Sequence, residues 1–285
     1  MNINECMHYA KDILKNANIE APVHEAGVML CKVLKCGRTY LYSHGDRELS
    51  IDEKAVLDHM LVQRTGNIPL QYIVGDTEFM SLRFLVTPAV LIPRQDTELL
   101  VEKTIDLLNQ GKTGTNKKVL DMCTGSGCIA VSIAYFCPEC SIVACDVSQK
   151  ALDVAKANSE LNGVQNRVEL CCGDLFDAIK GGQKFDIIVS NPPYIETDII
   201  AGLQKEVRSY EPGLALDGGA DGLVFYRRII SSAPERLNRN GWLAFEIGYN
   251  QGEKVSALMK ESFVDIQIFK DYGGNDRVVI GQLIP

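Results

Sequence analysis

The tetrapeptide Asn191-Pro-Pro-Tyr194 directly follows the apolar run 185–190. Such a run predicts a buried strand, and ligands of open α/β sheets bind at the carboxyl ends of the strands. Because proline has a fixed φ and no N–H group, Pro192 and Pro193 end the strand and hold the neighbouring carbonyl groups in set directions. Those carbonyl oxygens and the Asn191 side chain are acceptors that suit a planar –NH2 group. The alternative is a loop that only terminates the strand.

A glycine-containing loop lies between an earlier strand pattern, 118–121, and a helical pattern that begins at Ile129. Glycines let a ligand approach the backbone, and a helix N-terminus offers free N–H groups. The loop residues that we expect to line a cofactor site are Cys123, Thr124, Gly125, Ser126 and Gly127. We interpret Cys123 as a small residue whose backbone contributes to the cofactor site. No histidine follows His59 in the sequence to activate a thiol nucleophile.

Three aspartates stand at or just after the ends of successive strand patterns. Asp121 precedes the glycine loop, where a carboxylate suits an ammonium group and repels a pyrophosphate. Asp146 can accept hydrogen bonds from ribose hydroxyls, and Asp174 can meet an adenine amino group. A dinucleotide would leave Asp121 and Asn191 without a role, so we predict S-adenosylmethionine as the cofactor. The simpler alternatives are a helix N-cap for Asp146 and a turn residue for Asp174.

Length and composition indicate a two-domain, cytoplasmic protein. Its 285 residues exceed the roughly 150 of a typical domain. The net charge of −8 argues against a broad phosphate-binding surface, no apolar stretch is long enough to span a membrane, and the N-terminus lacks a signal-peptide pattern. The ten cysteines are scattered, which indicates reduced thiols. Cys137 and Cys140 have metal-ligand spacing but lack a second pair or histidines, so we predict no metal site.

Hydrophobic periodicity divides the chain into three parts. Residues 1–70 predict a small helical domain whose third helix opens at Asp52-Glu53. Residues 71–95 predict a β-hairpin connector, with strands at 71–75 and 82–86. Over residues 96–285 strands and helices alternate, which indicates an α/β domain with a parallel sheet. Its strands are expected at 118–121, 141–146, 168–172, 185–190 and 242–247, with a late antiparallel hairpin of 264–269 and 277–280.

Four segments, in their order along the chain, resemble the HemK-type peptide chain release factor glutamine methyltransferases. They are Ile92-Pro-Arg-Gln-Asp-Thr-Glu98, Asp121-Met-Cys-Thr-Gly-Ser-Gly127, Val189-Ser-Asn-Pro-Pro-Tyr-Ile195 and Asp271-Tyr-Gly-Gly-Asn-Asp-Arg277. The resemblance implies a Rossmann-like methyltransferase domain, with a mostly parallel seven-stranded sheet and an antiparallel C-terminal hairpin. It also implies that the helical domain helps to dock the substrate protein. The implied substrate is the glutamine of a Gly-Gly-Gln loop in bacterial-type release factors.

The same resemblance assigns residues to the two halves of the site. The loop 123–127, Asp146, Leu175 and Asn191 are expected to line the cofactor pocket, and Asn191 to Tyr194 to hold the glutamine side chain. Cys123 replaces a frequent glycine, so we expect this position not to need a positive φ. Leu175 replaces a frequent tryptophan, so we expect the adenine to rest on an aliphatic face.

The chemistry expected of the tetrapeptide depends on positioning, because a carboxamide nitrogen has a delocalised lone pair and is a poor nucleophile. We expect the Asn191 side-chain oxygen and the Pro192 backbone oxygen each to accept one N–H of the substrate amide, while Tyr194 packs against the amide plane. Each hydrogen bond contributes only about 0.5–1.5 kcal/mol. Alignment can contribute up to about 7–11 kcal/mol, so we expect no dedicated base.

Other interpretations remain open from the sequence. An adenine methyltransferase acting on DNA or RNA would use the same tetrapeptide, although the acidic chain lacks a basic stretch with interleaved aromatic residues. A nucleotide-binding module without catalysis and an NAD-linked oxidoreductase are less well supported. Arg94 and Glu98 fit either a contact with substrate or cofactor, or an ion pair at a helix start. The segment 271–277 is most simply a hairpin turn, although it could support the site.

Overall fold

The computed structural model describes residues 1–110 and 116–285, which form two compact units. The first unit comprises Met1–Gly75 and the later segment Gln204–Tyr210. The second unit comprises Asp76–Leu203 and Glu211–Pro285. The chain therefore enters the first unit twice, and this unit extends beyond the continuous helical domain predicted for residues 1–70.

The first unit is helical throughout its described elements. They are α1 (Ile3–Asn16), α2 (Pro22–Leu34), α3 (Arg38–Ser43), α4 (Ile51–Thr65), α5 (Leu70–Val74) and α10 (Lys205–Tyr210). Capping boxes begin α1 at Asn2 and α4 at Ser50, where each cap side chain accepts the N–H of a glutamate three residues later. The helices of the first stretch bury one apolar core, whose largest members include Leu14, Leu30 and Leu57.

A buried ion cluster ties α10 into the first unit. Arg64 of α4 is only 5% exposed and donates to both carboxylate oxygens of Glu25, at 2.6 and 3.1 Å. It also donates to Glu206 of α10 at 2.8 Å, and the Tyr210 hydroxyl donates to the carbonyl oxygen of Gly66 at 2.9 Å. Because a buried guanidinium is costly unless its donors are paired, Glu206 completes this unit.

The second unit opens with a β-hairpin made of β1 (Asp76–Phe79) and β2 (Leu82–Leu85). The prediction for β2 is confirmed, but the strand expected at 71–75 is wrong. Residues 71–74 lie in α5 (Leu70–Val74), and Gly75 caps this helix with a φ of +81°. A stretch of only five residues with a short apolar run fits one helical turn as well as a strand, so its periodicity alone does not decide between them.

A seven-stranded sheet forms the centre of the second unit. Its strands are β3 (Lys118–Met122), β4 (Ser141–Asp146), β5 (Val168–Cys172), β6 (Phe185–Ser190), β7 (Leu237–Glu246), β8 (Phe263–Lys270) and β9 (Asp276–Leu283). Their order is β5-β4-β3-β6-β7-β9-β8, and β9 runs antiparallel to both of its neighbours while the other pairings are parallel. The predicted mostly parallel sheet with an antiparallel C-terminal hairpin is thereby confirmed.

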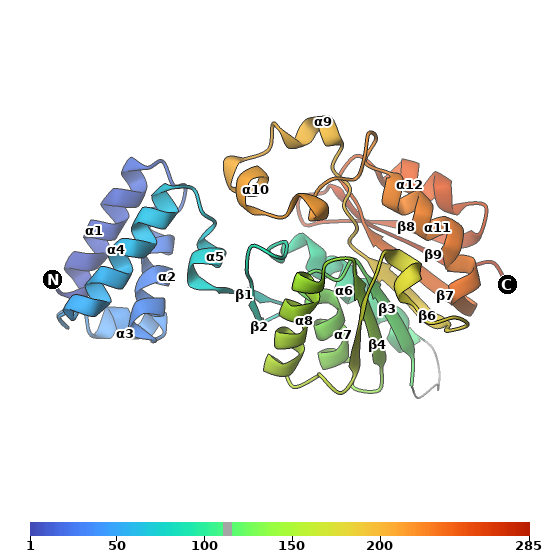
Figure 1. The fold of residues 1–285 in the computed structure, drawn as a ribbon, viewed down its shortest axis with the longest axis horizontal. Coiled ribbons are helices and arrows are strands. Elements are labelled where there is room, and N and C mark those ends of the chain that lie inside the picture. The colour runs from blue at the N-terminus through green and yellow to red at the C-terminus, as the bar shows by residue number, and fades with distance from the viewer. Residues whose placement is uncertain (111–115) are drawn as a thin grey trace. The chain divides into compact units, whose positions relative to one another are not determined.

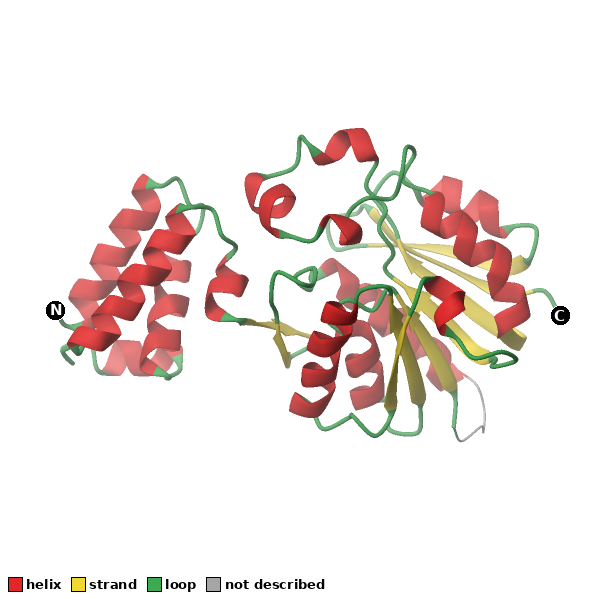
Figure 2. Ribbon diagram, viewed as in Figure 1, coloured by secondary structure: helices red, strands yellow, loops and turns green. Residues whose placement is uncertain are grey.

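Helices cover both faces of this sheet (Figures 1 and 2). One face packs against α6 (Asp96–Gln110) and α7 (Cys128–Phe136), with α8 (Gln149–Leu161) beside α7. The other face packs against α11 (Val224–Arg236) and α12 (Gly252–Met259). Along β3, Val119 packs in the core on the face covered by α6 and α7, and Leu120 packs in the core on the face covered by α11 and α12. Neighbouring side chains of a strand point to opposite faces of the sheet.

Three short elements complete the second unit. They are the 3-10 helices Leu175–Ala178 and Gly213–Ala215, and the helix α9 (Thr197–Ile200). Two of them belong to the long connection that runs from Asn191, after β6, to α11. Among the described residues, no helix combines the length and apolar character needed to cross a membrane.

Candidate active site

A cavity of about 340 Å³ opens at the carboxyl ends of β3, β4, β5 and β6. Its volume lies in the range of small-molecule sites. Nine predicted residues line it: Cys123, Thr124, Gly125, Ser126, Asp146, Asp174, Leu175, Asn191 and Pro193. Four predicted residues lie outside its lining: Asp121, Gly127, Pro192 and Tyr194. The sheet thus brings the glycine loop, two of the aspartates and part of the tetrapeptide to one site.

Asp146 shapes the glycine loop as well as the cavity wall. One of its carboxylate oxygens accepts the N–H of Gly125 and the other accepts the N–H of Ser148, both at 2.9 Å. Burial raises the pKa of Asp146, and these two backbone donors oppose that shift. The alternative of a helix cap is wrong, because the Ser148 hydroxyl caps α8 by accepting the N–H of Ala151. Asp146 therefore stands in the cavity as a hydrogen-bond acceptor.

Alternate residues of the glycine loop have a positive φ, and this corrects the expectation for Cys123. Its φ is +62°, and Gly125 and Gly127 follow at +54° and +78°. The connection from β3 to α7 dictates this backbone, so the position takes a positive φ although its residue is not glycine. Burial raises the pKa of the Cys123 thiol well above its usual value, which keeps the thiol neutral. At Gly127 an added Cβ would lie 3.0 Å from the Cβ of Ala155, so close packing demands glycine there.

Asp121 is fully buried beneath the loop. Its Oδ2 atom accepts the hydroxyl of Thr124 at 2.5 Å and the N–H of Ala130 at 3.1 Å. Its Oδ1 atom has no hydrogen-bond partner among the described residues. Burial raises the pKa of Asp121 to about 7, against the effect of its two donors. In this structure Asp121 braces the loop from below, and its predicted contact with an ammonium group stays a prediction.

Asp174 and Leu175 form the part of the wall that follows β5. Asp174 accepts a hydrogen bond from Arg228 of α11 at 2.7 Å, and both residues line the cavity. Leu175 lines the cavity too, with a φ of +51° and 7% of its surface exposed. An aliphatic side chain is therefore present where the sequence predicted an aliphatic support for adenine.

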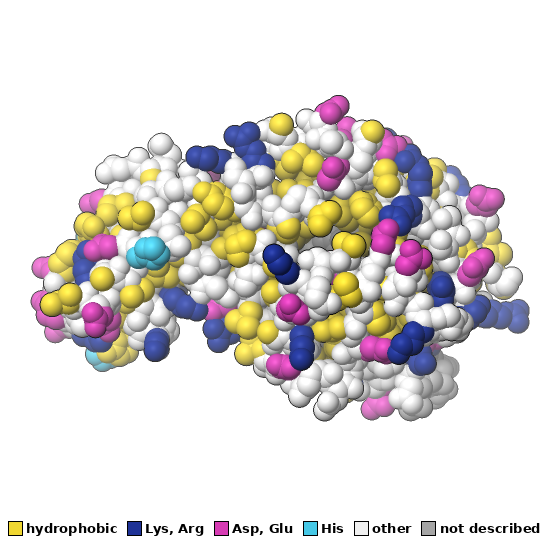
Figure 3. Space-filling model, in the orientation of Figure 1, with side chains coloured by type: hydrophobic (Ala, Val, Ile, Leu, Met, Phe, Trp, Pro, Cys, Tyr) yellow, Lys and Arg dark blue, Asp and Glu magenta, His cyan; other side chains and the backbone are white. Residues whose placement is uncertain are grey.

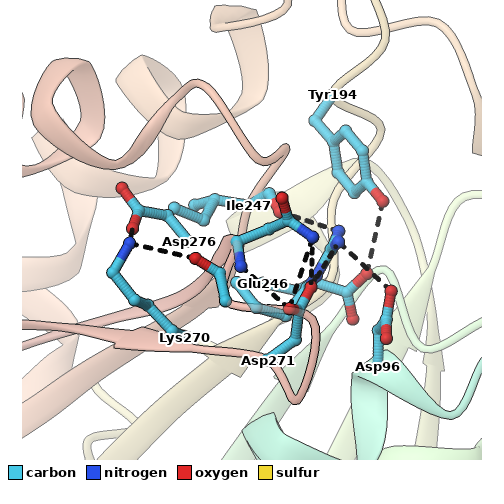
Figure 4. Close-up of polar contacts among 10 residues, drawn as sticks. Asp96, Tyr194, Glu246, Ile247, Lys270, Asp271 and Asp276 are labelled. Atoms are coloured by element: carbon cyan, nitrogen blue, oxygen red, sulfur yellow. Dashed lines mark hydrogen bonds and ion pairs between the residues drawn. The ribbon is translucent and has the colours of Figure 1, made fainter.

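The tetrapeptide divides its side chains between two environments. Asn191 faces the cavity, and its Nδ2 atom donates to the hydroxyl of Thr97 at 3.3 Å. Tyr194 instead directs its hydroxyl at the carboxylate of Glu246, at 3.3 Å (Figure 4). The carbonyl oxygen of Tyr194 accepts the side-chain N–H of Gln251 at 3.0 Å. In this structure Tyr194 thus holds the tetrapeptide through contacts that lie outside the cavity lining.

Arg94 and Glu98 do not pair with each other, so of the two alternatives from the sequence the ion pair at a helix start is wrong. Arg94 binds Glu211 at 2.5 Å, and Glu98 accepts the backbone N–H of Met80 at 2.6 Å. Arg94 also lines the cavity. The two partners come from the long connection after β6 and from the β-hairpin, and neither can be inferred from spacing along α6.

The C-terminal turn is confirmed as a hairpin turn, and it also reaches the site. Asp271 accepts the N–H of Asn275 at 2.9 Å and pairs with Arg277 at 3.0 Å. Arg277 pairs with Asp96 at the start of α6 as well, at 3.2 Å (Figure 4). This ion network lies beside Glu246, which accepts the Tyr194 hydroxyl. The β8–β9 turn therefore helps to hold the Tyr194 end of the tetrapeptide.

Some site residues escaped the sequence analysis. Thr97, Phe225 and Leu214 line the cavity, and Glu246 supports Tyr194. A glutamate inside the apolar strand pattern 242–247 was a signal that could have been used, because an ionisable side chain in such a strand needs a partner. Phe225 and Leu214 offered no comparable signal.

Comparisons with known proteins agree with this geometry. The model described as PrmC N-terminal domain matches residues 5–75, and the model described as Methyltransferase small domain matches residues 95–204. A release factor glutamine methyltransferase of Geobacter sulfurreducens is 42% identical over 282 residues, covering 99% of this chain and 96% of the relative. One of Clostridium acetobutylicum is 40% identical over 284 residues, covering 98% of each.

Solved structures of other methyltransferases share the fold. A T. thermophilus 16S rRNA methyltransferase in complex with AdoMet and guanosine is 18% identical, with a TM-score of 0.51 over 73% of this chain and 50% of that chain. Human methyltransferase 10 domain containing protein is 19% identical, with a TM-score of 0.52 over 72% of this chain and 90% of that chain. At such identities the likeness concerns the fold alone.

Proposed function

Since this chain belongs to the release factor glutamine methyltransferases, we propose that it methylates the side-chain nitrogen of the glutamine in the Gly-Gly-Gln loop of bacterial-type peptide chain release factors. It is an S-adenosylmethionine-dependent enzyme that methylates release factors on glutamine N5.

The observation that carries the proposal is the position of Asn191 at the cavity. Its Nδ2 atom is engaged by Thr97, which leaves the Oδ1 atom as the acceptor that can meet a substrate N–H. We propose the backbone oxygen of Pro192, whose direction the two prolines restrict, as the second acceptor; Pro192 itself is buried and lies outside the cavity lining. Two acceptors on one –NH2 group would orient its nitrogen. This suits a neutral carboxamide, which needs alignment more than it needs a base.

The cavity residues fit S-adenosylmethionine by their chemistry. The cofactor supplies an electrophilic methyl group when it is bound. Asp146 offers an acceptor for ribose hydroxyls, the glycine loop brings residues 123–126 to the cavity, and Leu175 gives an apolar support for adenine. Asp174 stands next to Leu175 as an acceptor for an adenine amino group, with Arg228 to hold its orientation. Asp121 has one buried oxygen that finds no hydrogen-bond partner in the part of the chain that the structure describes, which suits an ammonium group nearby.

A protein substrate is also supported by the charge of the surface. The face seen in Figure 3 mixes acidic with basic side chains, and the chain carries a net charge of −8. Binding of a nucleic acid depends mainly on basic side chains that contact phosphates. The tetrapeptide therefore fits the nucleic-acid alternative, but the negative net charge of the chain does not.

The test is methyl transfer to a purified bacterial release factor, read by mass spectrometry of the peptide that contains the Gly-Gly-Gln loop. We expect one added methyl group on the loop glutamine, and none when that glutamine is replaced by alanine. Methylation at another residue would refute the proposed target. Transfer to DNA or RNA under the same conditions, with none to the release factor, would favour the nucleic-acid alternative.

Asn191→Asp tests the proposed role of the amide. The change keeps the size and an acceptor, but it removes the donor to Thr97 and adds a charge. We expect turnover to fall by roughly 100-fold or more, because a misplaced nucleophile costs about that much. Binding of S-adenosylmethionine, measured by calorimetry, should stay near normal. Asn166→Asp makes the same change at an exposed position and serves as the matched control.

A further inference from the structure

Gln251 is a buried amide that joins three separate stretches of backbone in the second unit. It directly precedes α12 and is 4% exposed. Its Nε2 atom donates to the carbonyl oxygen of Tyr194 at 3.0 Å and to that of Gly222 at 3.3 Å. Its Oε1 atom accepts the N–H of Gly248 at 2.9 Å and lies 3.4 Å from the hydroxyl of Tyr226. Because two carbonyl oxygens and one backbone N–H surround the amide, only one orientation of it satisfies all three.

The two carbonyl groups that Gln251 binds belong to backbones in close contact. Gly222 has a φ of +68°, and a Cβ atom added there would lie 2.4 Å from the carbonyl oxygen of Tyr194. A Cβ atom added at Gly218 would lie 2.7 Å from the Cα atom of Tyr194. Only glycine permits both approaches. The Nε2 atom of Gln251 therefore spans a contact that leaves the Tyr194 peptide little room to move.

The residues on either side of the tetrapeptide are also held by hydrogen bonds. The N–H of Ile195 donates to the carbonyl oxygen of Leu216 at 3.0 Å, and the carbonyl oxygen of Ile195 accepts the N–H of Gly218 at 2.8 Å. Ser190 ends β6, and its buried hydroxyl donates to the carbonyl oxygen of Met122 at 2.7 Å. The tetrapeptide thus spans two fixed points of the backbone.

Between these two points the backbone has few free torsions. Pro192 and Pro193 restrict two of its φ angles. The directions of the Pro192 carbonyl group and of the Asn191 side chain therefore depend on where the two ends are held. The sheet holds the first end, and the contact of Gln251 with the Tyr194 oxygen helps to hold the second.

We propose that Gln251 is a positioning residue for methyl transfer, because it holds the Tyr194 end of the tetrapeptide where the tetrapeptide can align the substrate amide. This inference rests on the proposed function of Asn191 and Pro192 as acceptors for that amide. Gln251 lies outside the cavity lining, so it acts through the tetrapeptide rather than on the reactants. Loss of its two donor contacts should therefore misplace the substrate amide and leave the cofactor site intact.

The test replaces Gln251 by glutamate and measures kcat and the KM for S-adenosylmethionine at saturating release factor. Gln251→Glu keeps the shape and an oxygen that accepts from Gly248. A carboxyl group has at most one hydrogen to donate, so at least one of the carbonyl oxygens of Tyr194 and Gly222 loses its donor. We expect kcat to fall by roughly 10- to 100-fold, because a displacement of about 1 Å costs about 100-fold. The KM for S-adenosylmethionine should stay near that of the wild-type chain.

Two further variants separate positioning from other effects. Gln251→Met has a similar length, carries no donor and adds no charge, so it should lower kcat by a comparable factor. Gln282→Glu is the matched control, because Gln282 also donates to a backbone oxygen, that of Asn240 at 2.9 Å in the first half of β7. This control should keep the wild-type kcat. Circular dichroism and the stoichiometry of cofactor binding in calorimetry give the folded fraction of each variant, to which kcat is referred.

A lower kcat with unchanged cofactor affinity in both Gln251 variants supports the positioning role. A wild-type kcat in either variant overturns it, while the proposed function stands as long as the wild-type chain methylates the release factor loop. If kcat and cofactor affinity fall together, or if neither variant folds, Gln251 has a structural role only and the inference is overturned. If the wild-type chain leaves the loop unmethylated, the proposed function fails, and this inference fails with it.

Discussion

Replacement of Asp121 by asparagine removes a carboxylate that is fully buried beneath the cofactor loop. The wild-type side chain has two donors on Oδ2 and no partner on Oδ1 among the described residues. Burial raises its pKa in the folded chain from 3.8 to about 7. The folded state therefore holds this proton more tightly than the unfolded state does. The resulting stability is fully present below pH ~4 and is lost as pH rises to about 7.

The size of this effect follows from the two pKa values. One pKa unit corresponds to about 1.4 kcal/mol, so the full change corresponds to about 4 kcal/mol. Between pH 5 and pH 8 the wild-type chain should lose about 3 kcal/mol of unfolding free energy through Asp121. Asp121→Asn has no such proton, so the difference between variant and wild type should shift by about 3 kcal/mol in favour of the variant over this range.

Urea unfolding at pH 5 and pH 8, without cofactor, measures this difference. The contribution of Glu246 and of every other titrating group cancels, because both proteins contain them. Asp198→Asn removes an exposed carboxylate and should change the unfolding free energy by less than about 0.5 kcal/mol at either pH. A difference between Asp121→Asn and wild type that is the same at both pH values would refute the argument from burial.

Two further predictions concern the cofactor loop. Because Cys123 has a φ of +62°, Cys123→Gly should be more stable than Cys123→Ala by roughly 1 kcal/mol in chemical denaturation; equal stabilities would show that the left-handed backbone is not strained. Because Asp146 uses both oxygens to accept the N–H groups of Gly125 and Ser148, Asp146→Asn should weaken binding of S-adenosylmethionine by roughly tenfold or more in calorimetry; unchanged affinity would remove Asp146 from the cofactor site.

The sequence predicts the second unit well because its strands carry strong local signals. The apolar run 185–190 and the turn at 271–276 both depend on residues that are neighbours in the chain, and both predictions are confirmed. The run 71–75 was too short for its periodicity to distinguish a helical turn from a strand. At Cys123 the residue type gave no warning of a positive φ, because the connection between β3 and α7 sets the backbone there.

The parts of the site that escaped prediction depend on contacts between distant segments. Thr97 and Asn191 come from α6 and the end of β6, Glu246 and Tyr194 from β7 and the tetrapeptide, and no spacing rule brings either pair together. The same holds for Arg64 and Glu206, which meet only because the chain returns to the first unit. Sequence reasoning found the groups at the strand ends, but not the second layer that holds them in place.

The return of the chain to the helical unit has a consequence for modularity. Gln204–Tyr210 lies in sequence between the tetrapeptide and β7, yet it completes the unit that begins at Met1. Removing the segment 204–210 from the helical unit would deprive the buried Arg64 of Glu206, one of the two carboxylates that pair with it. Recombination at a single point in the gene therefore cannot exchange the whole helical unit. A change of the helical unit by recombination would also have to include the segment 204–210, which is encoded within the methyltransferase part of the gene.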